Sequence, residues 1–468
     1  MRKKIMIVAT IFILCFIILI IGVSGDDPPS PSVEKALSFR LQAPPPEDNA
    51  YVGISGMRFI EYDDVAAAGV KFLKGELRPD AEPQLQIDIS YRNPCFGSKF
   101  PGTPGGAEKA DDSANCLEQI VAEAQAINEA VRKNAALIER YRAVQSMPLF
   151  VNTTTDVNDP IPMYQPLIES TRLLGAQALL DVKRGNIDAG LEALETELAF
   201  FKKIASSEYA GLIDLMIAMA GTQISFLELS KIIEDPQIDL AGHERRLRQM
   251  LDLSLNANQM MARALESEKR CFLSGVSETA EIWFGQEMSL KERFRSKSFK
   301  FLYKKNMTLN RIAARTDEVI QRFEAAPLLG FPDFAAAYAE AELKEMEANT
   351  GLEPTVKELY DRYGLFFFKN YAGEAMTTLA QPLYMRYWSR INDAVVYSRL
   401  LLAALELRLM DSRPEDLSEA LAGLGPETWN PYTGQPFNWD RERNTIWGEK
   451  ANQMKDADPM DRRMEVKI

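Results

Sequence analysis

Histidine is almost absent from this chain, with one residue in 468. Multi-histidine zinc sites, two-histidine iron sites and the Glu-x-x-His pairs of ferritin-like bundles are excluded, because each needs several imidazole ligands. Positive charge is also in deficit: 54 Lys and Arg stand against 67 Asp and Glu, which gives a net charge of −13. Such a chain is not expected to attract nucleic acid by its net charge. We therefore expect no metal, no cofactor and no nucleic acid.

Motifs that carry common chemistry are missing as well. Nucleophile elbows, Ser-x-x-Lys, Walker loops, dinucleotide-binding glycines and EF-hand loops do not occur in a suitable context. What is present is the composition of an ordered globular protein, with 46% apolar and 26% charged residues. The length allows one large core or several packed units, but the sequence indicates no particular reaction.

One long uncharged apolar run is present, from Ile5 to Val23, directly after three basic residues at 2–4. As a helix it reaches about 28 Å, enough for a bilayer core of about 30 Å. A cleaved signal peptide is the alternative, although this run is longer than usual and Val23-Ser24-Gly25 is only a passable cleavage site. Both interpretations export the following chain. For a bacterial protein we predict a single-pass inner-membrane anchor with the bulk of the chain in the periplasm.

The four cysteines fit that location. Cys15 lies in the apolar run, whereas Cys95 and Cys116 flank a Gly- and Pro-rich loop without a helical or strand period. In an oxidising compartment a disulfide closing such a loop contributes about 3 kcal/mol. Two free thiols or half of a metal site are the alternatives. We predict a Cys95–Cys116 disulfide and interpret Cys271 as a small buried hydrophobic residue.

Periodicity divides the rest of the chain. Residues 24–50 have proline clusters near both ends and are interpreted as a semi-rigid spacer, with room for a short membrane-proximal helix within it. Residues 51–112 combine an apolar run at 51–54, a helix capped by Asp63 or Asp64, and an alternating segment at 85–91 typical of a half-buried strand. From residue 113 onward apolar residues recur at three and four positions, which predicts helices, the first of them one long helix from Leu117 to Ile138.

An antiparallel helical hairpin is predicted at 162–182 and 187–206, with Gly185 taking the positive φ of a helix C-terminal cap. Its second half is TPR-like, although no neighbouring copy of a TPR repeat follows. Further helices are predicted at 210–234, 240–257, 259–273, 290–305, 308–325, 335–347, 355–363, 374–410 and 414–422. After Gly425, two aromatic-rich strands indicate a β-hairpin with Trp439 and Trp447 packed against the helices.

The predicted fold class is all-α: an irregular array of antiparallel helical hairpins, TPR-like in places, with a small N-terminal α+β piece, a C-terminal β-hairpin and one N-terminal transmembrane helix. The predicted divisions are a cytoplasmic basic tail at 1–4, a transmembrane anchor at 5–23, a Pro-rich linker at 24–50, a small α+β region with the disulfide loop at 51–112, a helical domain at 113–424, a β-hairpin cap at 425–450 and a flexible tail at 451–468.

Several segments occur together in one order: CFGSK with CLEQI, LIDLMIAMAGTQISFLELSKII, KKNMTLNRIA, KNYAGEAMTTLAQPLYMRYWSRINDAVVYSRLLLAALELRL and NPYTGQPFNWD. In this combination the chain resembles an uncharacterised family of membrane-anchored, exported, predominantly helical proteins of Gram-negative bacteria, over roughly residues 51–447. The resemblance implies a location and a fold, and it brings no enzymatic activity.

The segment KERFRSKSFKFLYKK, residues 291–305, has seven basic residues and one Glu interleaved with aromatic residues. It is suited to anionic lipid headgroups, an acidic protein or an anionic envelope polymer. An ordinary amphipathic helix with a wet basic side is the favoured alternative. The candidate binding residues here are Lys297, Lys300, Lys304 and Lys305.

Two polar pairs interrupt apolar helices: Asn306 with Asn310, and Arg390 with Asp393. Buried polar groups are costly unless they bond to one another or to helix ends, so a structural network is the favoured interpretation. A polar ligand pocket between helices is the alternative. His243, beside several arginines, is interpreted as part of a solvated helix face rather than as a general base.

These features predict a non-enzymatic, membrane-anchored helical protein that binds a protein or an anionic envelope component, or acts as a scaffold. The alternative is an envelope enzyme or small-ligand-binding protein that has a pocket between helices and uses carboxylates without a metal. The decisive question is whether Arg390, Asp393 and Glu374 line one solvent-reachable cavity.

Overall fold

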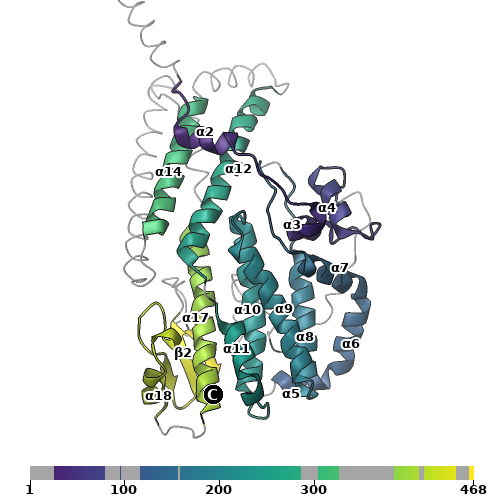
Figure 1. The fold of residues 1–468 in the computed structure, drawn as a ribbon, viewed down its shortest axis with the longest axis vertical. Helices are drawn as coiled ribbons and strands as arrows, with labels where there is room; N and C mark the ends of the chain where they lie inside the picture. The colour runs from purple at the N-terminus through teal and green to yellow at the C-terminus, as the bar shows by residue number, and fades with distance from the viewer. Residues whose placement is uncertain are drawn as a thin grey trace, which may run out of the picture.

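The computed structural model describes residues 26–79, 95, 116–156, 159–253, 255–285, 304–325, 384–410, 416–449 and 463–468. They are mostly helical, with one small antiparallel sheet, as Figure 1 shows. The elements are α2 (Pro31–Ser38), α3 (Ala50–Gly56), α4 (Val65–Leu73), α5 (Cys116–Ala122), α6 (Ala124–Lys133), α7 (Ala135–Ser146), α8 (Gln165–Lys183), α9 (Ile187–Ser206), α10 (Leu212–Glu234), α11 (Glu244–Leu251), α12 (Ala257–Gly285), α14 (Lys305–Ala325), α17 (Tyr384–Leu409), α18 (Leu417–Gly423), β1 (Asn438–Asp440), β2 (Thr445–Glu449) and β3 (Arg463–Lys467). The predominantly helical prediction is confirmed, whereas a TPR-like arrangement is not.

Helices α8, α9 and α10 form the centre of the molecule (Figure 1). The predicted α8–α9 hairpin is confirmed, and Gly185 in its turn has a φ of 88°. Helix α10 packs against both members of the hairpin and also contacts α12, α17 and β3. It passes the length and hydropathy test for a membrane span, but 67% of its most apolar window is buried inside the protein. Helix α10 is therefore a core helix in this fold.

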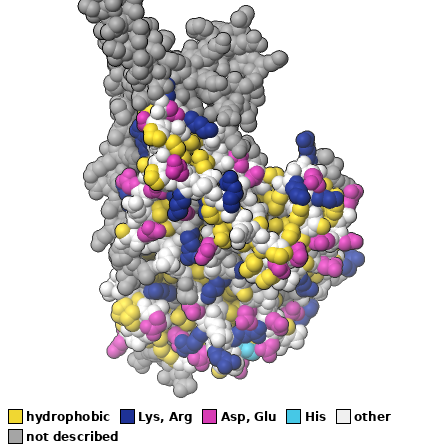
Figure 2. Space-filling model, turned by 45° about the horizontal axis from the view of Figure 1, so that its top comes forward, with side chains coloured by type: hydrophobic (Ala, Val, Ile, Leu, Met, Phe, Trp, Pro, Cys, Tyr) yellow, Lys and Arg dark blue, Asp and Glu magenta, His cyan; other side chains and the backbone are white. Residues whose placement is uncertain are grey.

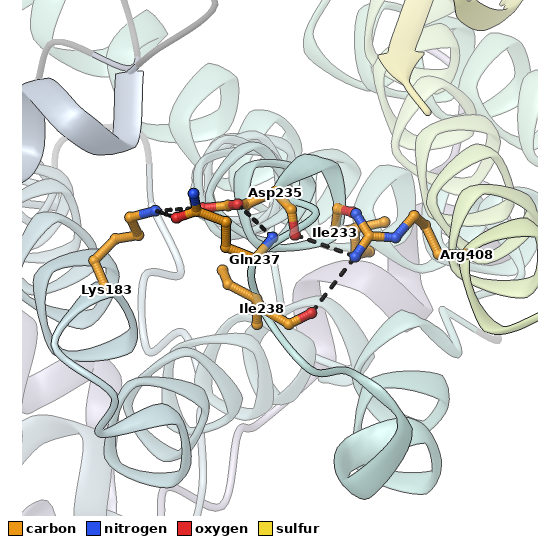
Figure 3. Close-up of polar contacts among 6 residues, drawn as sticks. All are labelled: Lys183, Ile233, Asp235, Gln237, Ile238 and Arg408. Carbon is orange, nitrogen blue, oxygen red and sulfur yellow. Dashed lines mark hydrogen bonds and ion pairs between the residues drawn. The ribbon is translucent and has the colours of Figure 1, made fainter.

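The C-terminal end of α10 is held by charged side chains from two other helices. Arg408 of α17 donates to the backbone oxygens of Ile233 and Asp235 at 3.0 and 3.1 Å (Figure 3). Lys183, at the end of α8, forms an ion pair of 2.6 Å with the Asp235 carboxylate. Cations at a helix C-terminus satisfy orphan carbonyls and complement the helix dipole. These contacts fix α8, α10 and α17 to one another at one end of the bundle.

The predicted long helix from Leu117 to Ile138 is wrong, because the chain forms three helices there, α5, α6 and α7. Asn134 separates α6 from α7, and its side chain donates to the Ala130 backbone oxygen at 2.9 Å. An asparagine that bonds to nearby backbone competes with the helical pattern. The breaks let α5, α6 and α7 each contact α8.

The N-terminal region described here is helical. Asp64 caps α4 as predicted, and its Oδ1 accepts from the Ala66 N–H at 2.8 Å. The apolar run at 51–54 lies within α3. The predicted strand at 85–91 lies outside the described residues, so the α+β piece stays a prediction.

Residues 24–50 contain a short helix, α2, as the sequence allowed, but this helix packs on the body, which differs from a free spacer. Helix α2 packs against α12 and α14, and Val33 is fully buried with Leu273, Leu309, Ile312 and Ala313. The proline clusters indicated a stiff segment, but the apolar residues of α2 give it a face to bury. We call residues 26–40 the strap, because they lie across one end of the α12–α14 pair (Figure 1).

The predicted β-hairpin is confirmed, with β1 antiparallel to β2. A third strand, β3, also pairs with β2, so the predicted flexible tail is wrong for residues 463–467. Side chains alternate between the two faces of β3, and Val466 lies in the core, where Ile446 is also fully buried. Trp439 and Trp447 are only half-buried, and Arg463 lies 4.0 Å above the Trp447 ring.

We expect Gly221→Ala to lower the free energy of unfolding by about 1–3 kcal/mol, as overpacking does. A methyl group at Gly221 of α10 would lie 2.1 Å from the Phe201 ring of α9, and that ring is fully buried. Urea unfolding measures the change. Gly423→Ala is the control, because no atom lies within 4 Å of its added methyl group; equal effects of the two substitutions would contradict close packing of α9 on α10.

Candidate functional site

The strap is bonded to the first turns of α14. Asp26 accepts from the backbone N–H groups of Asn306 and Met307 at 2.9 and 3.1 Å, which satisfies donors at the start of the helix. Asn310 donates to the Pro28 oxygen at 2.9 Å and accepts from the Ser30 N–H at 2.6 Å. The chain that follows the apolar run Ile5–Val23 is therefore attached to the body within three residues of that run.

These contacts decide between two interpretations of Asn306 and Asn310. Asn310 belongs to a structural network, because both ends of its amide bond to strap backbone. Asn306 contributes its backbone N–H to the same network. The favoured interpretation is confirmed for Asn310, and the sequence could not identify the strap as its partner, which lies 280 residues away.

Two of the four candidate lysines lie within the described residues. Lys297 and Lys300 lie outside the described residues. Lys304 has 5% of its surface exposed, so we withdraw it as a candidate for partner binding. Lys305 begins α14 and is half-buried.

Arg390 and Asp393 of α17 differ in their exposure to solvent. Arg390 is exposed on α17, whereas Asp393 is 7% exposed and accepts from the Tyr432 hydroxyl at 3.3 Å. Burial raises the pKa of Tyr432 well above its usual value, and the Asp393 charge adds to the effect. Glu374, the third member of the predicted cavity, lies outside the described residues. The contact with Tyr432 connects α17 to the chain that enters the sheet.

Cys95 and Cys116 are a disulfide pair in the structure, with 5.1 Å between their Cα atoms. Cys271 on α12 is half-buried, and its thiol donates to the Thr154 oxygen at 3.5 Å. Burial raises the pKa of Cys271 to about 12, which keeps it protonated and unreactive at neutral pH. The structural interpretation of Cys271 therefore holds.

Sequence reasoning missed a group of carboxyls buried among the central helices. Asp214 lies in the first turn of α10 and accepts from the Gly211 N–H at 2.8 Å, from the Asn152 amide at 2.6 Å and from the Tyr164 hydroxyl. Burial raises its pKa even though all three hydrogen bonds favour the charged form. Glu268 of α12 accepts from the backbone N–H of Leu212, the first residue of α10, at 3.0 Å. Both carboxyls act as caps for the N-terminus of α10.

Glu197 of α9 lies deeper in the bundle and is 2% exposed. Its carboxyl accepts from the Tyr141 hydroxyl, from the Thr171 hydroxyl at 3.2 Å and from the Gln145 amide at 3.0 Å. Burial nevertheless raises the pKa of Glu197 to about 7. The group connects α7, α8 and α9 through polar contacts inside an otherwise apolar core.

Glu228 of α10 is the most unusual of these carboxyls. It is fully buried, and neither of its oxygens has a hydrogen-bond partner within the described part of the chain. It faces Gly175 of α8, where a methyl group would lie 1.6 Å from Oε1. Burial raises its pKa well above the usual range, and the nearby Glu197 charge adds to the rise. A neutral, protonated Glu228 is the form compatible with this position.

Surface grooves occur in two places that concern the sequence predictions. The first is lined from α11 and the turn before it, by Gly242, Arg245, Arg248, Gln249 and Asp252 among others. The second, of about 590 Å³, lies where α2, α12 and α14 meet. In the second groove Lys269 bonds to Asp317 at 2.6 Å and also pairs with Glu266. Its principal charges therefore neutralise one another.

The described residues contain no group of three or more His, Cys, Asp or Glu side chains suited to a metal ion. His243 lies 3.5 Å from Asp188 across the α9–α11 surface, a position consistent with its interpretation as a surface residue. The chain matches no protein-family model, no curated protein and no solved structure. Its function must therefore be argued from its own residues.

The buried carboxyls predict a stability that depends on pH. An unfolded Glu ionises near pH 4.3, and the folded-state pKa of Glu197 is about 7, so the unfolded chain releases protons that the folded chain retains. The contribution of this carboxyl to stability is therefore full below about pH 4 and is lost as pH rises through 7. For Glu197 the loss amounts to roughly 3 kcal/mol, and Glu228 acts in the same direction.

Glutamine mimics the protonated carboxyl, so we expect the double variant Glu197→Gln with Glu228→Gln to flatten this decline and to be more stable than the parent at pH 8. Urea unfolding from pH 5 to pH 8 is the measurement. Glu192→Gln, an exposed position on the same helix, is the control. A double variant whose pH profile coincides with that of the parent would show that these carboxyls are ionised in the folded protein.

Proposed function

We propose that this chain is a single-pass inner-membrane protein whose helical body lies in the periplasm, where it binds a protein or an anionic component of the cell envelope, or acts as a scaffold. The observation that carries the proposal is the attachment of the strap to α14 directly after the apolar run.

Two other features support the proposal. The Cys95–Cys116 pair is suited to an oxidising compartment. The basic segment 291–305 ends at the start of α14, where Asp26 is also bonded, so a cationic part of the sequence adjoins the proposed membrane attachment. Anionic lipids and envelope polymers are attracted to such segments.

The alternative, an envelope enzyme or ligand-binding protein, predicted a cavity shared by Arg390 and Asp393. Arg390 is exposed, Asp393 is buried against Tyr432 and Glu374 lies outside the described residues, so the described residues give that alternative no support. A binding or scaffold role needs no such cavity and is the function that we propose.

The location is tested by thiol labelling in intact cells. We expect Cys95 and Cys116 to resist alkylation until a reductant is added, because the disulfide forms only where thiols are oxidised. A C-terminal alkaline phosphatase fusion should be active, since that enzyme folds only in the periplasm. Free thiols at both positions together with an inactive fusion would place the body in the cytoplasm and overturn the proposal.

The binding role is tested by chemical crosslinking of the full chain in native membranes. Replacement of Lys297, Lys300 and Lys305 by Gln should weaken the crosslinked products several-fold, because the partner is expected to be acidic. The reagent should target carboxyls or a photoactivated label elsewhere on the chain, so that loss of lysines does not itself remove the crosslinking groups.

The matched control replaces three lysines elsewhere, Lys133, Lys202 and Lys467, by Gln. The control has the same change in net charge, so products that weaken equally in both variants would reflect bulk charge rather than a binding surface. Products unchanged in the first variant would remove the basic segment from the proposal.

A further inference from the structure

The position of the strap limits where the body can lie relative to the proposed anchor. Residues 24 and 25 alone separate Val23, the end of the apolar run, from Asp26. Three consecutive Cα–Cα steps reach at most about 11 Å. The polar layer on each side of a bilayer is about 5–8 Å thick. Asp26 and the first turn of α14 must therefore lie in or just above the headgroup layer if the run spans the membrane.

The strap is fastened to the body by contacts distributed along its length. Asp26 bonds to the start of α14, Asn310 bonds to Pro28 and Ser30, and Val33 is fully buried between α12 and α14. The side chain of Ser30 in turn accepts from the Val33 N–H and caps α2. Because the strap contacts the body at three successive points, it holds the body in a fixed position relative to the proposed anchor.

The charges and exposed side chains at the strap end of the molecule favour contact with an anionic membrane. The strap together with residues 304–315 contains six Lys or Arg, of which Lys304 is buried, and three Asp or Glu, in a chain of net charge −13. Phe39, at the end of α2, is 36% exposed, and Arg270 lies 4.1 Å from its ring centre. Figure 2 brings this end toward the viewer and shows hydrophobic side chains on the described surface with Lys and Arg among them. Such mixtures of cations and apolar groups are typical of surfaces that contact lipid headgroups.

We propose that the strap and the first turns of α14 lie on the periplasmic surface of the inner membrane and contact anionic lipid headgroups. This inference rests on the proposed anchor. It adds an orientation: the α12–α14 pair projects from the bilayer, and the end of the molecule with α5, α18 and the β-sheet is turned away from it (Figure 1). The body is then held in a defined orientation rather than on a free tether.

Fluorescence quenching in vesicles tests the orientation with the full chain. In a background with Cys15→Ser and Cys271→Ser, a single cysteine is placed at Glu34, at Met307 or at Val121 and labelled with a small fluorophore. Val121 is the matched control, because it is 44% exposed but lies on α5. The protein is reconstituted into phosphatidylethanolamine and phosphatidylglycerol vesicles in which part of the lipid has a nitroxide on its headgroup.

We expect labels at positions 34 and 307 to lose about half of their fluorescence and the label at 121 to lose almost none, because headgroup quenchers act only near the polar layer. The variant Asn310→Ala, which removes two strap contacts, should reduce quenching at position 34 while its far-UV circular dichroism stays unchanged. Both results together support the orientation.

Vesicle flotation distinguishes failure of the proposed anchor from failure of the proposed orientation. Protein that does not float with the vesicles has no anchor, which overturns the proposed function and this inference with it. Protein that floats but shows equal quenching at positions 34, 307 and 121 is anchored with a body in no fixed orientation, which overturns only this inference. Quenching at position 121 alone would reverse the orientation.

Discussion

The burial of most of α10 among other elements is the constraint on which the rest of the structure depends. A helix that contacts α8, α9, α12, α17 and β3 has few positions left from which water can reach its ends. Its unpaired backbone groups must therefore be satisfied by protein, since each buried orphan group costs about 1–3 kcal/mol. Asp214 and Glu268 provide acceptors at the N-terminus, and Arg408 provides donors at the C-terminus. The positions of Asp214, Glu268 and Arg408 follow from this requirement.

The same requirement explains which helices are neighbours. Glu268 belongs to α12 and Arg408 to α17, so the two ends of α10 are capped by helices distant in sequence. Apolar packing alone would allow either helix to slide along α10, because hydrophobic contacts are not directional. A carboxylate at one end and a guanidinium at the other fix the register. Glu228 has no such partner among the residues that the structure describes, and its neutral form is tolerated where an ionised carboxylate would not be.

Local patterns predicted local structure well. Gly185 between two apolar-periodic segments identified the α8–α9 hairpin, and Asp64 identified the start of α4. The breaks at Glu123 and Asn134 were not predictable from periodicity, because the apolar stripe continues through both and only the packing of three short helices on α8 separates them. Strand β3 was missed for a similar reason: its charged sequence has little strand character until pairing with β2 buries Val466.

The candidate site was less predictable than the fold, since its contacts join residues far apart in the chain. Asn306 and Asn310 were identified as polar residues that needed partners, but the strap lies 280 residues earlier and had been interpreted as a spacer by its prolines. Asp214 and Glu228 could have been noticed as two acids inside a continuous apolar segment. Composition could not show that Asp214 caps a helix, or that Glu228 faces Gly175 and finds no partner within the described ranges.

The link between the apolar run and the body depends on a cluster that is separate from the main core. Val33 is buried with Leu273, Leu309, Ile312 and Ala313, and this group does not merge with the large cluster around α8, α9 and α10. Burial of one valine stabilises by about 1.5–3 kcal/mol, and each hydrogen bond to the strap adds about 1 kcal/mol. The strap can therefore detach from α12 and α14 without unfolding the central helices. Because α2 covers the apolar side chains of that cluster, detachment would expose them beside the proposed membrane surface, where lipid is available to cover them.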